Sequence, residues 1–274
     1  MNLNELFRHR RDNYLIQKND IYIMQNLIAQ HLDIWTAAHK TRSTAGRGSS
    51  NKLDLYGIKK LRELILELAV RGKLVPQDAS DEPASELLKK IAAEKAKLIK
   101  EGKIKKEKPL PEISDEEKPF ELPIGWEWCR LPDVGELARG KSKHRPRNDP
   151  KLYLDGTIPL IQTGDVARSG KTIQSYSALY NDFGLAQSRL WPKGTMCITI
   201  AANIADTGLL GIDACFPDSV VGFLPYDKNI SVTYFESFIK VTKDHLEKFA
   251  PSTAQKKHQF GNTWRFTCSL STTK

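Results

Sequence analysis

The feature that most constrains the fold is a strict alternation of side chains from Thr195 to Ala201. Met196, Ile198 and Ile200 would lie on one face of an extended strand, and Thr195, Cys197 and Thr199 on the other. A period of two residues is typical of a β-strand that buries one face, and it differs from the 3.6-residue period of a helix. The sequence therefore predicts a half-buried strand here.

Two further strands and one helix are predicted around it. The apolar runs Ile158–Gln162 and Val220–Leu224 indicate strands, and glycine-containing turns such as Thr207-Gly208 separate the runs. Thr233 with Glu236 three residues later predicts a capping box at a helix start. The helix would pack one apolar face, formed by Phe235, Phe238, Ile239, Thr242 and Leu246. We predict an α+β fold with a mostly β domain and one packed helix.

Ahead of this domain the periodicity is helical. From Ile58 to Arg71 an apolar seam follows the spacing of a coiled coil, and Gly72 is placed to end the helix. A second helix is predicted from about Asp81 to Glu101, ending at Gly102. We therefore predict a two-helix, coiled-coil-like region. Its seam consists of Ile58, Leu61, Ile65 and Leu68.

Charged and glycine-rich connectors divide the chain. Residues 42–51 predict a flexible linker, and the proline-containing Lys103–Pro119 segment predicts a linker without fixed structure. The predicted divisions are an uncertain leader, an N-terminal segment with its linker, a helical spacer, a charged linker, a globular domain and a C-terminal tail. Their bounds are 1–23, 24–57, 58–102, 103–119, 120–256 and 257–274.

Composition restricts the class of protein. The net charge of +9 favours a polyanionic partner, although many basic proteins bind none. No apolar run approaches the ~20 residues of a membrane helix, and no signal-peptide core is present. We therefore expect a cytoplasmic location and no membrane contact. The four cysteines lack a Cys-x-x-Cys spacing, so reduced thiols are expected.

No catalytic signature is found in the sequence. A Walker A loop, a Gly-x-Gly-x-x-Gly loop, the Asn-Pro-Pro-aromatic run of DNA methyltransferases and paired metal-ligand histidines are all absent. We expect no catalytic residue, no metal and no cofactor on this chain. A stand-alone nuclease or DNA methyltransferase is the alternative.

Basic and amide side chains that could bind DNA gather in several loops. Six basic residues and one acid lie between Arg139 and Lys151, where a loop on a sheet could follow a phosphate backbone; a merely solvated loop is the alternative. Gln162 could read adenine and Thr163 a thymine methyl group, although a Gly-Asp turn is often only a turn. The candidates are Arg139, Lys141, Ser142, Lys143, His144, Arg145, Arg147, Gln162, Thr163, Asp165, Arg168, Ser169, Lys171, Asn203 and Thr207.

Several short motifs occur in a characteristic order. They are Leu122-Pro123-Ile124-Gly125-Trp126, Arg139–Lys143, Ile158–Val166 and Pro251–Lys256. Together they resemble the target recognition domain of the specificity subunit of type I restriction–modification systems, over about Met24 to Lys256. The resemblance implies a non-catalytic subunit that reads one half of a bipartite double-stranded DNA target.

The resemblance also implies partners and further site residues. Modification and restriction subunits would dock on the helical region with its apolar seam, and these partners would hold S-adenosylmethionine, ATP and Mg²⁺. The polar stretch before the last strand of such domains would contact phosphate, which adds Ser252, Thr253, Gln255 and Lys256 to the candidates.

Both ends of the chain depart from the resemblance. Met24 resembles a family N-terminus, so we expect translation to start there, with a true extension as the alternative. One coding string from Lys256 onward, AAA AAA CAT CAA TTT GGA AAT ACT TGG, begins AAA AAC ATC AAT TTG GAA ATA CTT when one A is lost. The second string encodes Lys-Asn-Ile-Asn-Leu-Glu-Ile-Leu, as the family would continue.

A frameshift would leave an out-of-frame tail. We expect His258–Lys274 to be disordered or poorly packed, because its apolar residues follow neither a helical nor a strand period. Self-association of truncated subunits, or a non-functional remnant, are further alternatives.

Overall fold

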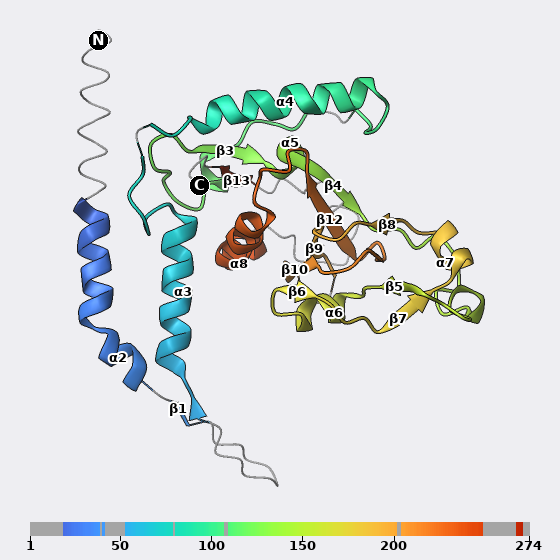
Figure 1. Ribbon diagram of the computed structural model, residues 1–274, viewed down its shortest axis with the longest axis horizontal. Helices are drawn as coiled ribbons and strands as arrows, with labels where there is room; N and C mark the ends of the chain where they lie inside the picture. Colours follow the sequence, from blue (N-terminus) through green and yellow to red (C-terminus); the bar gives the residue numbers. More distant parts are fainter. Residues whose placement is uncertain are drawn as a thin grey trace. The chain divides into compact units, whose positions relative to one another are not determined.

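The computed structural model describes residues 19–38, 40–41, 53–78, 80–106, 109–201, 204–248 and 267–270. The chain divides into two compact units. We call Met1–Ala84, Phe120–Trp126 and Ser271–Lys274 the helical unit, and Ser85–Pro119 with Glu127–Leu270 the sheet unit. Helices and sheets occur together, as Figure 1 shows, so the predicted α+β class is confirmed.

The described residues of the helical unit form three helical segments and one small sheet. Residues 19–30 are helical. They are followed by α2 (Leu32–Ala37), the antiparallel pair β1 (Lys40–Thr41) and β2 (Leu53–Asp54), and α3 (Tyr56–Val70). The helical segments at residues 19–30 and 32–37 were not predicted. The predicted linker at residues 42–51 lies outside the described residues.

The predicted end of α3 is confirmed. Gly72 has φ +66°, a left-handed conformation that glycine adopts without strain. The Lys73 N–H donates to the Leu68 carbonyl at 2.8 Å, which closes the helix in a Schellman motif.

The Leu-Pro-x-Gly-Trp motif packs on this helix end. A Cβ on Gly72 would come within 2.6 Å of Pro123 Cγ and 2.8 Å of the Trp126 ring. Trp126 Nε1 donates to Gln77 Oε1 at 2.8 Å. The sequence predicts residues 120–126 at the start of the globular domain, whereas the structure groups them with the helical unit.

Two main sheets form the sheet unit. The five-stranded sheet has the order β4 (Gly135–Arg139), β12 (Val220–Pro225), β9 (Met196–Thr199), β10 (Thr207–Leu210) and β6 (Thr172–Ile173). Its neighbours are antiparallel except β10 and β6. The four-stranded sheet has the order β7 (Ala178–Tyr180), β5 (Ile158–Leu160), β11 (Ala214–Cys215) and β8 (Leu190–Trp191). The strands predicted at 158–162 and 220–224 correspond to β5 and β12.

Helices connect and cover these strands. They are α4 (Ala84–Lys100), α5 (Leu131–Val134), α6 (Thr163–Arg168), α7 (Asp182–Ala186), α8 (Val232–Lys248) and the short 3-10 helices η1 (Asp115–Glu117) and η2 (Pro150–Leu152). The predicted helix from about Asp81 to Glu101 corresponds to α4, and Gly102 follows it with φ +70°.

Aromatic stacking fills one side of the five-stranded sheet. Trp191 and Phe216 are fully buried and stack with their ring centroids 5.0 Å apart. Gly222 on β12 makes room for them, because a Cβ there would meet Phe216 at 2.7 Å and Trp191 at 2.8 Å. Helix α8 packs on the opposite face, where Phe235 contacts Phe223 edge to face.

The prediction that residues 195–201 form a half-buried strand is wrong about burial. All four residues of β9 are buried. The strand is central, and Cys197 belongs to the cluster of Trp191 and Phe216 on one face of the sheet. Alternation along a strand shows that one face is apolar, but it does not show whether the other face is exposed. Small polar residues such as Thr199 can be buried on that face when they form hydrogen bonds. Here the Thr199 hydroxyl accepts from the Asp206 N–H at 3.1 Å.

The capping box predicted at Thr233 is also wrong. Helix α8 begins at Val232, so Thr233 lies inside its first turn and is not the N-cap. The Glu236 carboxylate is buried and pairs with Lys240, so it does not return to the helix start. Thr207-Gly208 is not a turn either, because both residues belong to β10.

The charged linker has fixed structure where it is described. Residues 109–119 are described and contain η1. Arg130, which is only 3% exposed, donates to both Glu117 carboxylate oxygens and to the carbonyls of Pro111 and Glu112. A buried guanidinium must find acceptors, and the linker supplies them.

Part of the C-terminal tail is ordered, contrary to the prediction. Thr267–Leu270 forms β13, which pairs antiparallel with β3 (Glu127–Arg130). The four residues extend the backbone hydrogen bonding of β3, which any sequence in an extended conformation can do. Residues 249–266 and 271–274 lie outside the described part.

Candidate nucleic-acid interface

The predicted basic loop begins where β4 ends. The Gly140 N–H donates to Val220 O at 2.9 Å, and the Lys141 N–H donates to Phe216 O at 3.1 Å. Gly140 is required for this approach, since a Cβ would lie 2.1 Å from Phe216 O. The start of the loop is thus fixed to the core.

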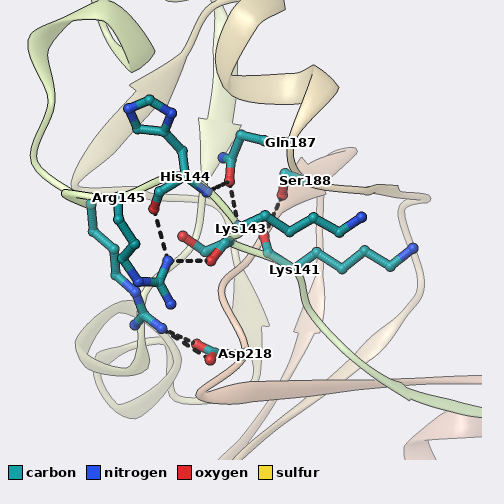
Figure 2. A network of polar contacts seen from close by, with 9 residues as sticks. Lys141, Lys143, His144, Arg145, Gln187, Ser188 and Asp218 are labelled. Carbon is teal, nitrogen blue, oxygen red and sulfur yellow. Dashed lines mark hydrogen bonds and ion pairs between the residues drawn. The ribbon is translucent and has the colours of Figure 1, made fainter.

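Two side chains that follow α7 hold the next residues of the loop. Gln187 Oε1 accepts the backbone N–H of Lys143 at 2.6 Å and that of His144 at 3.0 Å. The Ser188 hydroxyl donates to Lys141 O at 2.8 Å. Figure 2 shows this network, with Gln187 and Ser188 facing the backbone of the loop.

The lysines of the loop present free charges. Lys141 and Lys143 are exposed, and their side chains extend in the same direction away from the loop (Figure 2). In the part of the chain that the structure describes, neither ammonium group has a hydrogen-bond or ion-pair partner. Two exposed cations on a fixed backbone can bind phosphate oxygens.

The arginines of the loop are already engaged. Arg145 Nη1 donates to the carbonyls of Ser142 at 2.6 Å and His144 at 2.8 Å, so the guanidinium folds back on its own loop. Arg147 forms an ion pair with Asp218, whose two carboxylate oxygens lie 2.7 and 2.9 Å from Nη2. Ser142 is buried. The sequence grouped these residues with the lysines, but their charges are partly satisfied within the protein.

An acid in the loop restrains His144. The His144 Nε2 lies 2.8 Å from Asp149 Oδ2, and the ring also meets Phe183 edge to face. The pKa of Asp149 is lowered, first by the hydrogen bond from the Lys151 N–H and next by the bond to His144. The acid therefore stays ionised and stabilises the turn into η2.

Asp165 is structural in this arrangement. It is 4% exposed and accepts from the Gln162 N–H at 2.8 Å, the Ser177 hydroxyl at 2.9 Å and Arg168 Nη2 at 2.8 Å. The hydrogen-bond partners of the carboxylate are therefore groups of the protein itself. The carboxylate thereby holds Ser177 against α6, and the exposed Gln162 side chain completes a capping box with the Asp165 backbone.

The second basic loop follows α6. Arg168 is 71% exposed although it pairs with Asp165, and Lys171 is exposed. The Ser169 hydroxyl donates to Val166 O at 2.8 Å and so caps the helix. Lys240 on α8 donates to Gly170 O at 2.9 Å. Figure 1 places α6 apart from α7, so the two basic loops are separate features of the sheet unit.

The remaining candidates are not brought into either loop. Thr207 is the first residue of β10 and is buried, with its hydroxyl 3.4 Å from Glu236 Oε1, which corrects its predicted place on a loop. Arg139 ends β4 opposite Val221, and Thr163 begins α6. Asn203, Ser252, Thr253, Gln255 and Lys256 lie outside the described residues.

Sequence reasoning missed the residues that support the loop. Gln187 and Ser188 lie between α7 and β8, and Asp218 lies between β11 and β12, in short connections that carry no known motif. Their role depends on contacts with residues far away in the chain.

In the described residues, no group of three or more His, Cys, Asp or Glu side chains is arranged to hold a metal ion. Cys129, Cys197 and Cys215 form no disulfide. The helices of the described ranges include none that is long and apolar enough to cross a membrane.

Comparison with known families agrees with the resemblance. Residues 123–262, just over half of the chain, match the family model described as the type I restriction modification DNA specificity domain. The chain belongs to this family. The specificity-domain match includes both basic loops and extends six residues beyond Lys256.

Individual relatives of the specificity-domain family cover only part of the chain. The chain is 75% identical over 140 residues to the type I restriction enzyme EcoAI specificity subunit of Escherichia coli, and 69% identical to the EcoEI specificity subunit. Each alignment covers 51% of this chain and 23% of the relative. The alignments thus span about a quarter of the length of these relatives.

Solved structures show more distant similarity. One is the HsdS subunit from Thermoanaerobacter tengcongensis, with 14% identity, a TM-score of 0.41, and coverage of 88% of this chain and 56% of that chain. Another comes from a study titled as the structural basis of complex assembly and conformational transition of the type I R-M system. It has 16% identity, a TM-score of 0.43, and coverage of 94% and 58%.

Proposed function

We propose that this chain binds double-stranded DNA through the loop that carries Lys141 and Lys143, as part of a type I specificity subunit. The observation that carries the proposal is the pair of exposed ammonium groups, without a partner among the described residues, on a backbone held by Gln187 and Ser188. Phosphate oxygens are the natural partners of such groups, and the net charge of +9 adds long-range attraction.

The test is a salt titration of binding to a fluorescein-labelled duplex of random sequence. Replacing Lys141 and Lys143 with Ala should flatten the slope of log K against log salt by roughly 1.8, since each phosphate contact contributes about 0.9. Arg145 is kept, because its removal would also release two loop carbonyls.

The control replaces Lys193 and Lys228 with Ala, which removes the same charge away from the loop. Lys193 precedes the turn at Gly194, and Lys228 follows β12. A slope that falls equally in the control would mean that total charge, rather than this loop, determines binding.

Base recognition would come from Gln162. Its side chain is exposed at the start of α6, and its backbone is fixed by Asp165. Glutamine can contact adenine through two hydrogen bonds, worth about 1–3 kcal/mol of discrimination. Selection of bound duplexes from a random library should then show one position whose preference disappears in Gln162→Ala. If every position keeps its preference, Gln162 does not read a base.

We also propose that the chain is non-catalytic and docks on modification and restriction subunits in the cytoplasm. It would read one half of a bipartite target, while S-adenosylmethionine, ATP and Mg²⁺ bind to those partners. The proposal is supported by the family and by the apolar residues of α3, whose predicted role was coiled-coil-like docking.

The exposure of individual seam residues on α3 allows a test of docking. Ile65 is 36% exposed, whereas Leu68 is 7% exposed, so the two seam residues differ in what an acid would do. Ile65→Asp should abolish co-purification with the modification subunit and leave the chain folded. Leu68→Asp should unfold the helical unit, because a buried unpaired carboxylate is costly. Retention of the modification subunit by folded Ile65→Asp would remove α3 as the docking element.

A further inference from the structure

We propose that Gln187 is a positioning residue for DNA binding, which fixes the loop that presents Lys141 and Lys143. The inference rests on the proposed function and adds a residue outside the basic loop. One carboxamide oxygen accepts two consecutive backbone N–H groups, of Lys143 and His144. These two bonds fix the backbone of the loop at Lys143 and at the residue that follows it.

The orientation of the Gln187 amide is itself determined. Its Nε2 donates to Gly184 O at 2.9 Å, so the amide nitrogen points to α7 and the oxygen points to the loop. A flipped amide would place a donor against two donors and lose all three bonds. The side chain is thus set before any ligand binds.

Helix α7 ties both ends of the basic loop. At its N-terminus, the Asn181 side chain accepts from the Gly184 N–H at 3.0 Å and donates to Lys151 O at 3.0 Å and Leu154 O at 2.9 Å. At its C-terminus, Gln187 holds residues 143 and 144. The helix therefore braces the segment from Lys143 to Lys151 at two points.

The contacts of Gln187 order the loop before DNA binds, and this order affects the affinity for DNA. Fixing a loop costs conformational entropy, and a binding site that is already ordered does not lose that entropy when the ligand arrives. Without the Gln187 acceptor, the two backbone N–H groups would form hydrogen bonds with water, because the loop is at the surface. The loop would then have to be ordered by DNA, and binding would weaken without loss of any charge.

The experiment compares Gln187→Leu with the wild-type full-length chain. Leucine has a similar size but no acceptor. We expect faster amide hydrogen exchange at Lys143 and His144, and binding to the random-sequence duplex weakened roughly two- to tenfold, as for other coupled neighbours. Gln174→Leu is the matched control, because Gln174 is exposed and has no partner among the described residues. Gln187→Glu keeps an acceptor for the two amides but loses the donor to Gly184 O, so their exchange should be slower than in Gln187→Leu.

A merely structural role is excluded by a double-mutant cycle. In a background with Lys141 and Lys143 both replaced by Ala, Gln187→Leu should weaken DNA binding much less, because the charges that it positions are gone. An equal loss in both backgrounds, or unchanged amide exchange in Gln187→Leu, would overturn the proposal. If removing the two lysines has no effect on binding by itself, the proposed function fails at this loop, and the positioning role fails with it.

Discussion

At the scale of single residues, the charges that look alike in the sequence have different tasks. Arg130 is buried and holds the linker through Glu117, with Nη1 2.6 Å from Oε1 and Nη2 3.0 Å from Oε2. Lys141 and Lys143 are exposed and unpaired in the described structure. A buried charge stabilises the fold only with its partners, whereas an exposed charge is available to a ligand.

The Arg130–Glu117 pair predicts a pH dependence of stability. The Arg130 hydrogen bonds lower the pKa of Glu117 from 4.5 to about 2. A lowered pKa in the folded state stabilises the fold above the unfolded value, and this stabilisation is lost as the pH falls from about 4.5 towards 2. Glu117→Gln should reduce the free energy of unfolding by roughly 1.5–3 kcal/mol at neutral pH, with a smaller difference in acid.

Urea unfolding at several pH values measures this difference. Glu116→Gln is the control, because Glu116 is exposed and makes no contact with Arg130. A difference between wild type and Glu117→Gln that stays constant down to pH 2 would contradict the assignment.

At the scale of elements, two helices end in the same way but in different surroundings. Gly72 follows α3 with φ +66°, and Gly102 follows α4 with φ +70°. A Cβ on Gly72 would clash with Pro123 and Trp126, while one on Gly102 would meet nothing within 4 Å. The end of α3 is therefore a packing site as well as a cap.

This difference is testable with one substitution at each position. Both Gly72→Ala and Gly102→Ala introduce about 1–2 kcal/mol of backbone strain. Only Gly72→Ala adds overpacking, which typically costs about 1–3 kcal/mol more. Thermal unfolding followed by circular dichroism should show the larger loss for Gly72→Ala. Equal losses would mean that residues 123–126 can move away from the helix end without cost.

At the scale of the whole molecule, the compact units do not follow the order of the chain. The specificity-domain match starts at residue 123, inside the segment that the structure groups with the helical unit, and continues through the sheet unit. Near the C-terminus, β13 pairs with β3, and the two form a sheet of their own.

Removal of β13 should expose the edge of β3. We expect a chain that ends at Asn262 to aggregate at a lower concentration than the 274-residue chain, because unpaired strand edges associate. Light scattering over a concentration series measures this. Equal solubility of the two chains would mean that β13 does not protect β3.

Some properties of this protein follow from its sequence alone. The ends of α3 and α4, the α+β class and the membership in the specificity-domain family were all predicted. Helix periodicity and glycine caps depend on residues within about four positions of one another, and motif order is a property of the sequence itself. The capping box predicted from local spacing at Glu236 was wrong, because the Glu236 carboxylate contacts Lys240 and Thr207 instead of the helix start.

The tertiary structure decided which side chains can meet a ligand. Arg147 is paired with Asp218, 71 positions later, and the Lys143 backbone is held by Gln187, 44 positions later. Likewise, β9 is buried on both faces because β12, β10, α8 and the Trp191 cluster surround it. Neither periodicity nor composition encodes such distant partners in readable form. Whether a charged side chain is free or paired is determined only when folding brings it next to its distant partner.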